Sequence, residues 1–318
     1  MPRLFCFGLG YTALVLARRL RQEGWTVAGT CRGEDKRKAL QDEGIETFLF
    51  DDGRPLADPS VALAGATHLL SSIAPGRGTD GDADRVDPVL AAHDDDIAAI
   101  KQSLRWVGYL STTSVYGDRD GAWTDESATL GATSVRGRRR IAAEQAWQDG
   151  AARETGVPVH CFRLAGIYGP GRSAIDQLRH GTARRIDKPG QVFNRIHVED
   201  IATIVQASMN SPRGGAVYNC ADDDPAPSHE VVAHAAGLLG IAPPPLVPFD
   251  QAELSPMGRS FYAENKRTDN GLIKRELGVR LAHPTYREGL RAQLAGEKGG
   301  GNGPASPPSR SGPSPSTP

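Results

Sequence analysis

A short apolar run that ends at a pair of glycines constrains this chain more than any other feature. Leu4 to Phe7 predicts a buried strand, and Gly8-Leu9-Gly10-Tyr11-Thr12-Ala13 follows it directly. Apolar residues then recur at helical spacing from Thr12 to Glu23, and Trp25 to Thr30 predicts a second strand. A strand, a glycine turn and a helix in this order are typical of a βαβ unit that binds a dinucleotide.

Each residue of the glycine turn has a physical task in such a unit. Gly8 allows the tight turn out of the strand, and Gly10 lets a pyrophosphate approach the backbone. Ala13 is small enough for helix and strand to pack closely, and the free amides of the first helical turn, at Tyr11 and Thr12, would hold the phosphates. We therefore predict a dinucleotide site at these five residues. The alternative is a turn with a structural role only.

The residues at the end of the second strand bear on which dinucleotide binds. An NAD site usually has an acidic residue about 20 positions after the glycines, where it holds the ribose 2′-hydroxyl. Thr30-Cys31-Arg32 stands there instead, and Arg32 can pair with a 2′-phosphate. NADP is therefore predicted. NAD stays open, because Glu34 and Asp35 lie close by and could hold a ribose instead; the alternative for Arg32 is a solvated surface charge.

Two later strand ends are also expected beside the cofactor. Asp51 follows a third strand, Ile45 to Phe50, where a carboxylate can accept a hydrogen bond from the adenine amino group. A strand-end turn explains Asp51 equally well. Ser72 lies at the end of a fourth strand, His68 to Ile73, and ligands bind at this carboxyl edge in parallel sheets.

Strand and helix patterns alternate through the first half of the chain, which predicts an α/β fold: a doubly wound, Rossmann-type parallel sheet with helices on both faces. Three parts are expected: a nucleotide-binding core over 1–170, a smaller α+β substrate-binding part over 171–295 with segments that return to the core, and a disordered Gly/Pro/Ser tail over 296–318. The other expected elements are strands over Trp106–Leu110, Val157–Leu164 and Ala216–Cys220, and helices over Ser134–Glu154, Glu199–Met209, Ser228–Gly240 and Glu264–Leu277.

Composition narrows the class of partner. The 37 basic and 38 acidic residues leave a net charge of −1, which argues against a nucleic-acid binder. No apolar run approaches the roughly 20 residues of a membrane span, and no signal peptide is evident, so a cytoplasmic protein is expected. The four cysteines, Cys6, Cys31, Cys161 and Cys220, form no Cys-x-x-Cys pair. We interpret them as buried small hydrophobes and predict no metal site.

Downstream motifs resemble the extended and atypical branches of the short-chain dehydrogenase/reductase superfamily, which are similar to NAD-dependent epimerases and dehydratases. The motifs are Ser111-Thr112-Thr113-Ser114-Val115-Tyr116-Gly117, Arg163-Leu164 leading to Tyr168-Gly169-Pro170-Gly171, and Arg195-Ile196-His197-Val198-Glu199-Asp200-Ile201. The resemblance covers roughly residues 1 to 292. It implies a Rossmann sheet with a small C-terminal substrate-binding part, a cleft between them, and a homodimer formed through helices beside the active site.

The resemblance also implies a catalytic set: a Ser or Thr, a Tyr, and a Lys four residues after the Tyr. Thr112 matches the hydroxyl position, but Arg140 stands at the position of the Lys and Arg136 at that of the Tyr. No tyrosine occurs from Trp123 to Gly166. Arginine stays protonated and can hold a ribose or a phosphate, so Arg140 is expected beside the cofactor, but it cannot replace a tyrosine as proton donor.

Other residues are candidates for the missing chemistry. Tyr116 is a candidate acid, although the tyrosine of the family's Val-Tyr-Gly motif is generally structural. His197 is a candidate proton carrier and substrate contact, and a hydrogen-bonded structural histidine is the alternative. Arg172, directly after Gly-Pro-Gly, is expected to contact a phosphorylated or nucleotide-linked small molecule. The Tyr-x-x-x-Lys match from Tyr262 to Lys266 lies far from the cofactor half and is interpreted as chance.

The function that this pattern favours is an NADP-dependent oxidoreductase or an enzyme similar to nucleotide-sugar epimerases and dehydratases. The alternative is a non-catalytic protein that binds NADP and reports its redox state to a partner. The phosphate turn supports both, whereas the missing Tyr and Lys weaken the enzymatic interpretation.

Overall fold

Alternating residues of the first strand show how the central sheet is covered. In the computed structural model, which describes residues 1–76, 87–211 and 213–299, Leu4 and Cys6 join one hydrophobic cluster, whereas Phe5 and Phe7 join another. Successive strand residues point to opposite faces. A strand that is apolar at every position is therefore buried between two helical layers.

The sheet has seven strands, and every pairing in it is parallel. In sheet order they are β11 (Val217–Cys220), β7 (Val159–Leu164), β5 (Trp106–Thr112), β4 (His68–Ser71), β1 (Arg3–Phe7), β2 (Thr26–Cys31) and β3 (Glu46–Leu49). The chain runs outward from β1 to β3, then returns to β4 beside β1. This reversal confirms the Rossmann-type α/β fold, because it creates the crevice at which such sheets bind ligands.

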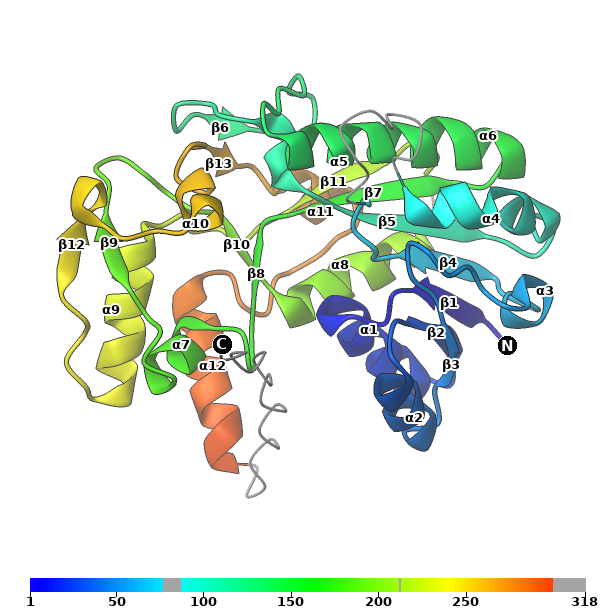
Figure 1. Cartoon of the computed structure of the whole chain (residues 1–318), viewed down its shortest axis with the longest axis horizontal. Helices are drawn as coiled ribbons and strands as arrows, with labels where there is room; N and C mark the ends of the chain where they lie inside the picture. The colour runs from blue at the N-terminus through cyan, green and yellow to red at the C-terminus, as the bar shows by residue number, and fades with distance from the viewer. Residues whose placement is uncertain (77–86, 212, 300–318) are drawn as a thin grey trace, which may run out of the picture.

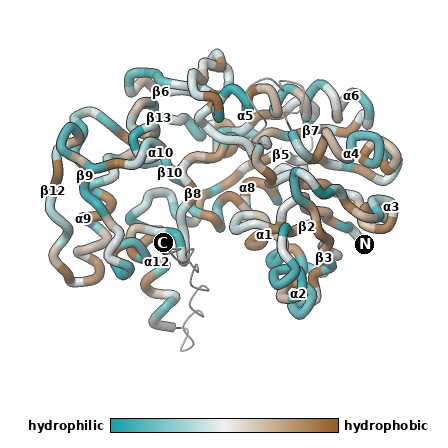
Figure 2. The backbone as a smooth tube through the Cα atoms, in the orientation of Figure 1, coloured by the Kyte–Doolittle hydropathy of each residue, from teal (hydrophilic) through white to brown (hydrophobic). Residues whose placement is uncertain are grey.

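Helices cover both faces of the sheet (Figure 1). One face carries α1 (Tyr11–Gln22), α2 (Glu34–Asp42), α8 (Val198–Asn210) and α11 (Gly271–Glu276), and the other carries α3 (Pro59–Ala62), α4 (Pro88–Ala99), α5 (Val135–Gln145) and α6 (Ala152–Thr155). Figure 2 shows hydrophobic residues along the strands of the sheet and hydrophilic residues on α2. The four cysteines are buried and free, as predicted.

A second, smaller group of elements has hydrophobic clusters of its own beyond the carboxyl edge of the sheet. It contains α7 (Ala174–Arg179), α9 (Ser228–Leu239), α10 (Pro256–Ser260), α12 (Tyr286–Gly299), and the pair β9 (Arg185–Asp187) and β12 (Leu246–Pro248). We call it the second lobe. Two more parallel pairs connect it to the sheet: β8 (Gly166–Tyr168) with β10 (Arg195–His197), and β6 (Trp123–Thr124) with β13 (Arg267–Thr268).

The structure corrects three expected elements. The helix expected over Glu264–Leu277 begins only at Gly271, because Arg267–Thr268 pairs with β6 instead. The helix expected over Ser134–Glu154 changes to a π-helical segment at Ala146–Ala151, where Trp147 is buried and stacks on Tyr109. The first residues of the tail expected from residue 296 belong instead to α12, which runs to Gly299; the rest of that expected tail, residues 300–318, lies outside the described part.

Within the described ranges, the structure contains no helix whose length and apolarity would let it cross a membrane.

Candidate functional site

The glycine turn is built as the sequence predicts. Gly8 has a φ of +89°, and a Cβ there would lie 2.9 Å from side-chain atoms of both Ile73 and Ser72. Its amide donates to Thr30 Oγ1 at 2.8 Å, which fixes the turn to the end of β2. Gly10 is the N-cap of α1 and has no side-chain cap, and a Cβ there would meet no atom within 4 Å. Free amides facing open space fit the pyrophosphate of a dinucleotide.

The residues predicted at the strand ends near the glycine turn differ in whether they border the cavity. Ser72 borders the cavity described below, and its hydroxyl donates to the Gly8 carbonyl. Arg32 is exposed at the end of β2, and Asp51 is exposed after β3. Neither lines the cavity, so their predicted roles toward the adenosine end remain predictions. Arg54, which sequence reasoning missed, donates from Nη2 to the Arg32 carbonyl at 2.5 Å and adds a second cation there.

A cavity of about 1160 Å³ joins the glycine turn to the second lobe. Gly10, Tyr11 and Thr12 border it together with Arg172, which follows β8. The Arg172 guanidinium lies 5.7 Å from the centre of the Tyr11 ring. Six cationic side chains line this cavity: Arg136, Arg139, Arg140, Arg172, Arg195 and Lys266. Among the described lining residues Glu264 is the one carboxylate, so the cavity is suited to an anionic ligand.

Thr112 and Arg140 lie where the resemblance implies, at the cavity. Thr112 ends β5 and accepts a hydrogen bond from the Ser114 amide at 3.2 Å, which fixes its hydroxyl at the carboxyl edge of the sheet. The Nη1 of Arg140 donates to the Leu110 carbonyl at 2.8 Å and to the Tyr109 hydroxyl at 3.0 Å. Arg140 therefore fastens α5 to β5 and presents only part of its guanidinium to a ligand.

Tyr116 is wrongly predicted as a catalytic acid. Its side chain is fully buried and does not line the cavity. The hydroxyl donates to Asn219 Oδ1 at 2.7 Å and accepts from Arg163 Nη1 at 2.9 Å, and burial raises the pKa of Tyr116 to about 12. Its proton is held in the core, away from any ligand, because this turn folds inward against β7 and β11.

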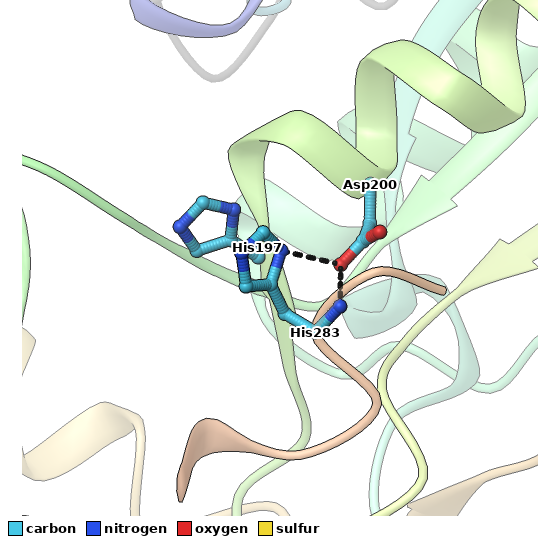
Figure 3. A group of neighbouring side chains, drawn as sticks. All are labelled: His197, Asp200 and His283. Atoms are coloured by element: carbon cyan, nitrogen blue, oxygen red, sulfur yellow. Dashed lines mark hydrogen bonds and ion pairs between the residues drawn. The ribbon is translucent and has the colours of Figure 1, made fainter. Parts of the chain in front are cut away.

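His197 is also wrongly predicted as a substrate contact. It is 4% exposed and lies outside the cavity lining, packed against His283 with ring centres 3.8 Å apart and ring planes tilted by 34° (Figure 3). Asp200 accepts from the amides of Ala282 at 2.7 Å and of His283 at 3.0 Å. Potential ligand atoms of the two histidines and Asp200 lie within 4.8 Å of one another, as in metal sites. The hydrogen bonds to Asp200 instead indicate a clasp that holds the 282–283 segment to α8.

This clasp predicts a loss of stability in acid. Burial, helped by the neighbouring His283, lowers the pKa of His197 from 6.5 to about 4. Between about pH 6.5 and pH 4 the unfolded chain binds a proton at His197 and the folded chain does not, so stability falls as pH falls through this window. The contribution is at most about 3 kcal/mol. Urea unfolding from pH 7 to pH 4.5 should give a shallower decline for His197→Gln than for the wild type.

The exposed His180 provides the control for this measurement. Its replacement by Gln should leave the decline unchanged, because the side chain lies at the surface and not in the clasp. An equal decline in wild type and His197→Gln would contradict the prediction.

Two further cavity residues come from the segment 262–266, which the sequence does not predict to lie near the cofactor. Lys266 and Glu264 both line the cavity, although the Tyr262–Lys266 match had been interpreted as chance. Tyr262 packs instead in a separate hydrophobic cluster with Ile186 and Ala252. The match thus has no meaning as a Tyr–Lys pair, but its lysine is part of the site. Arg195, from the Ile-His-Val segment, was also missed as a lining residue.

Comparisons with known proteins support the fold. The family model described as "NAD dependent epimerase/dehydratase family" matches residues 95–221. A functionally unknown conserved protein of solved structure from Silicibacter pomeroyi DSS is 53% identical, with a TM-score of 0.83 over 93% of this chain and 99% of its own. Protein YeeZ of Escherichia coli K12 is 29% identical over 77% of this chain and 86% of its own length. MoeE5, solved with UDP-glucuronic acid and NAD, is 23% identical with a TM-score of 0.72 over 93% of this chain and 98% of its own.

Proposed function

Because the chain belongs to the NAD-dependent epimerase/dehydratase family, we propose that it is an oxidoreductase or epimerase-like enzyme that binds a nicotinamide dinucleotide, NADP in preference to NAD. Its substrate is an anionic small molecule of the nucleotide-sugar class. One observation carries this proposal: a single cavity extends from the glycine turn to the second lobe with six cations and one carboxylate among its described lining residues. A dinucleotide and a nucleotide-linked substrate both bring phosphates that such a lining would neutralise.

The chain's own residues divide the work of binding. The free amides after Gly10 would hold the pyrophosphate, and Ser72 and Thr112 line the route toward the reacting end. The bound nicotinamide would accept or donate a hydride. Arg172, which lies over the Tyr11 ring, would hold a substrate phosphate near the N-terminus of α1.

Arg32 and Arg54 support the preference for NADP. Both follow strand ends on the side of the sheet where the adenosine ribose of a dinucleotide lies, and the Arg54 guanidinium contacts the Arg32 backbone. Arg32→Ala should weaken NADPH binding about tenfold and leave NADH binding unchanged, since only NADPH carries a 2′-phosphate. Fluorescence titration of both cofactors measures this. The exposed Arg280, outside the cavity lining, gives the control Arg280→Ala, for which both affinities should stay at the wild-type value.

The same titrations separate the two candidate functions. A protein that binds NADPH and turns over UDP-glucose, UDP-glucuronic acid or a related sugar nucleotide is an enzyme of the proposed kind. Tight NADPH binding without turnover of any such probe would favour the redox-sensing function, which the arginines on α5 also allow, because Arg136 and Arg140 stand where a proton-transfer pair is expected. Tighter binding of NADH than of NADPH would overturn the cofactor preference.

A further inference from the structure

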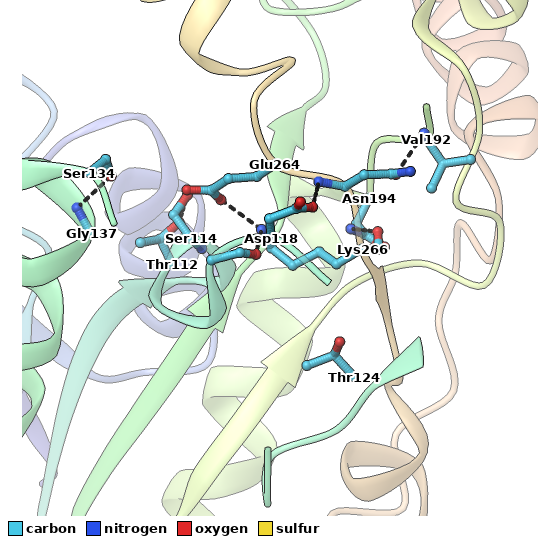
Figure 4. A network of polar contacts seen from close by, with 12 residues as sticks. Thr112, Ser114, Asp118, Thr124, Ser134, Gly137, Val192, Asn194, Glu264 and Lys266 are labelled. Atoms are coloured by element: carbon cyan, nitrogen blue, oxygen red, sulfur yellow. Dashed lines mark hydrogen bonds and ion pairs between the residues drawn. The ribbon is translucent and has the colours of Figure 1, made fainter. Parts of the chain in front are cut away.

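Glu264 and Lys266 meet the turn that carries Thr112, although about 150 residues separate the two segments in the sequence. Lys266 is 7% exposed, and its Nζ donates to the Gly117 carbonyl at 2.8 Å and to Glu264 Oε2 at 2.7 Å. Figure 4 shows Glu264 extending toward the Thr112–Ser114 turn. Glu264 and Lys266 line the same cavity as Thr112 and Ser114.

Hydrogen bonds with neighbouring side chains hold the backbone of residues 264–266 in place. The Glu264 carbonyl accepts from Gln191 Nε2 at 2.8 Å, and the Lys266 carbonyl accepts from Asn194 Nδ2 at 2.9 Å. Between them, the Asn265 amide donates to Asp118 Oδ1 at 2.7 Å. A polar pair held in this way keeps its geometry before a ligand arrives, which is what a reacting group requires.

The hydrogen-bonding capacity of the pair is only partly used. An ammonium has three N–H donors, and Lys266 has two acceptors among the described residues. Glu264 Oε2 accepts from Lys266, whereas Oε1 has no hydrogen-bond donor in the described part of the chain. Glu264 lines the cavity, and its carboxylate, with one oxygen free of donors from the described residues, points toward the turn that carries Thr112 (Figure 4).

The tyrosines at the cavity are less suited to moving a proton. The Tyr11 hydroxyl donates to the Pro170 carbonyl at 3.0 Å, and that of Tyr168 donates to the Thr285 carbonyl at 3.4 Å. Tyr286 is 1% exposed. A phenol whose proton is already given to a backbone carbonyl must break that bond before it can serve a substrate.

We propose that Glu264, positioned by Lys266, is the proton-accepting residue of this cleft and does the work of the tyrosine that α5 lacks. A substrate hydroxyl bound at Thr112 loses its proton to Glu264 Oε1 while the hydride on the same carbon leaves to the oxidised nicotinamide, so the alcohol becomes a carbonyl. In the reverse direction the proton returns from Glu264 to the carbonyl oxygen. This inference rests on the proposed function.

The first test needs no substrate. The oxidised nicotinamide ring carries a positive charge and the reduced ring does not, so a carboxylate that faces the reacting end stabilises the oxidised form. Glu264→Gln, which preserves the acceptor to Lys266, should raise the dissociation constant of NADP⁺ about fivefold relative to that of NADPH. Glu253→Gln, an exposed change outside the cavity lining, should leave the ratio at its wild-type value. An unchanged ratio in Glu264→Gln would overturn the inference.

The second test measures turnover of UDP-glucose and UDP-glucuronic acid. Glu264→Gln should lower kcat about 100-fold or more, with the melting temperature and NADPH affinity retained, and formate should restore part of the rate to Glu264→Ala. A Glu264→Gln protein with wild-type kcat overturns this inference alone. A wild type that binds NADPH but turns over neither probe overturns the enzymatic part of the proposed function, and this inference with it.

Discussion

Replacing Gly10 with aspartate should lower the affinity for NADPH at least about 100-fold while the protein stays folded. The backbone at Gly10 has a φ of −83°, which any residue can adopt, and a new Cβ would meet no atom within 4 Å. The fold therefore accommodates the side chain. The ligand does not, because a carboxylate would occupy the space of the pyrophosphate and repel its charge at about 4 Å.

Fluorescence titration of NADPH and thermal unfolding measure the two halves of this prediction. Gly214→Asp is the matched control: Gly214 is exposed, a Cβ there also meets nothing within 4 Å, and it precedes β11 at the opposite edge of the sheet. Both variants should melt near the wild-type temperature, and only Gly10→Asp should lose binding. Retained affinity in Gly10→Asp would mean that the dinucleotide does not use this turn.

Glu144→Ala should lower the free energy of unfolding by about 3–5 kcal/mol, the largest effect on stability that we expect from one substitution. Glu144 and Arg163 form a buried ion pair, with Arg163 Nη2 and Glu144 Oε2 2.8 Å apart and their side chains 2% and 6% exposed. Ser111 also donates to Glu144, and Arg163 donates to Tyr116. Removing the carboxylate leaves the guanidinium charged, buried and without its main partner.

Urea unfolding at neutral pH measures this loss of stability. It is a large fraction of the free energy of unfolding of a typical protein, which is about 5–15 kcal/mol. Glu144→Gln, which keeps hydrogen-bond acceptance, should lose less. Glu43→Ala is the control, because the Arg18–Glu43 pair has a similar distance of 2.9 Å but is exposed, and it should lose less than about 1 kcal/mol. A loss below 1 kcal/mol for Glu144→Ala would show that the buried pair does not hold α5 against the sheet.

The ion pair also explains why sequence reasoning misjudged Tyr116. The motif placed it correctly at the end of β5, but the direction of its side chain depends on Arg163 and Asn219, which come from β7 and β11. A pattern along the chain cannot include these partners, because neighbouring strands of a parallel sheet are distant in sequence. His197 was misjudged for the same reason, since His283, against which it packs, lies 86 positions further along the chain.

The sequence alone determined the parallel sheet, the glycine turn and the position of Thr112. These follow from local features: the period of the apolar residues, the lack of a side chain at Gly8 and Gly10, and the short motif at the end of β5. Only the tertiary structure decided which groups share the cavity. In the structure Tyr116 and His197 are buried in the core, whereas Glu264 and Lys266 line the cavity near the turn that carries Thr112. The physical reason is that a pairing of two residues each, β13 with β6, overrode the local helical preference and carried a distant segment to the carboxyl edge of the sheet.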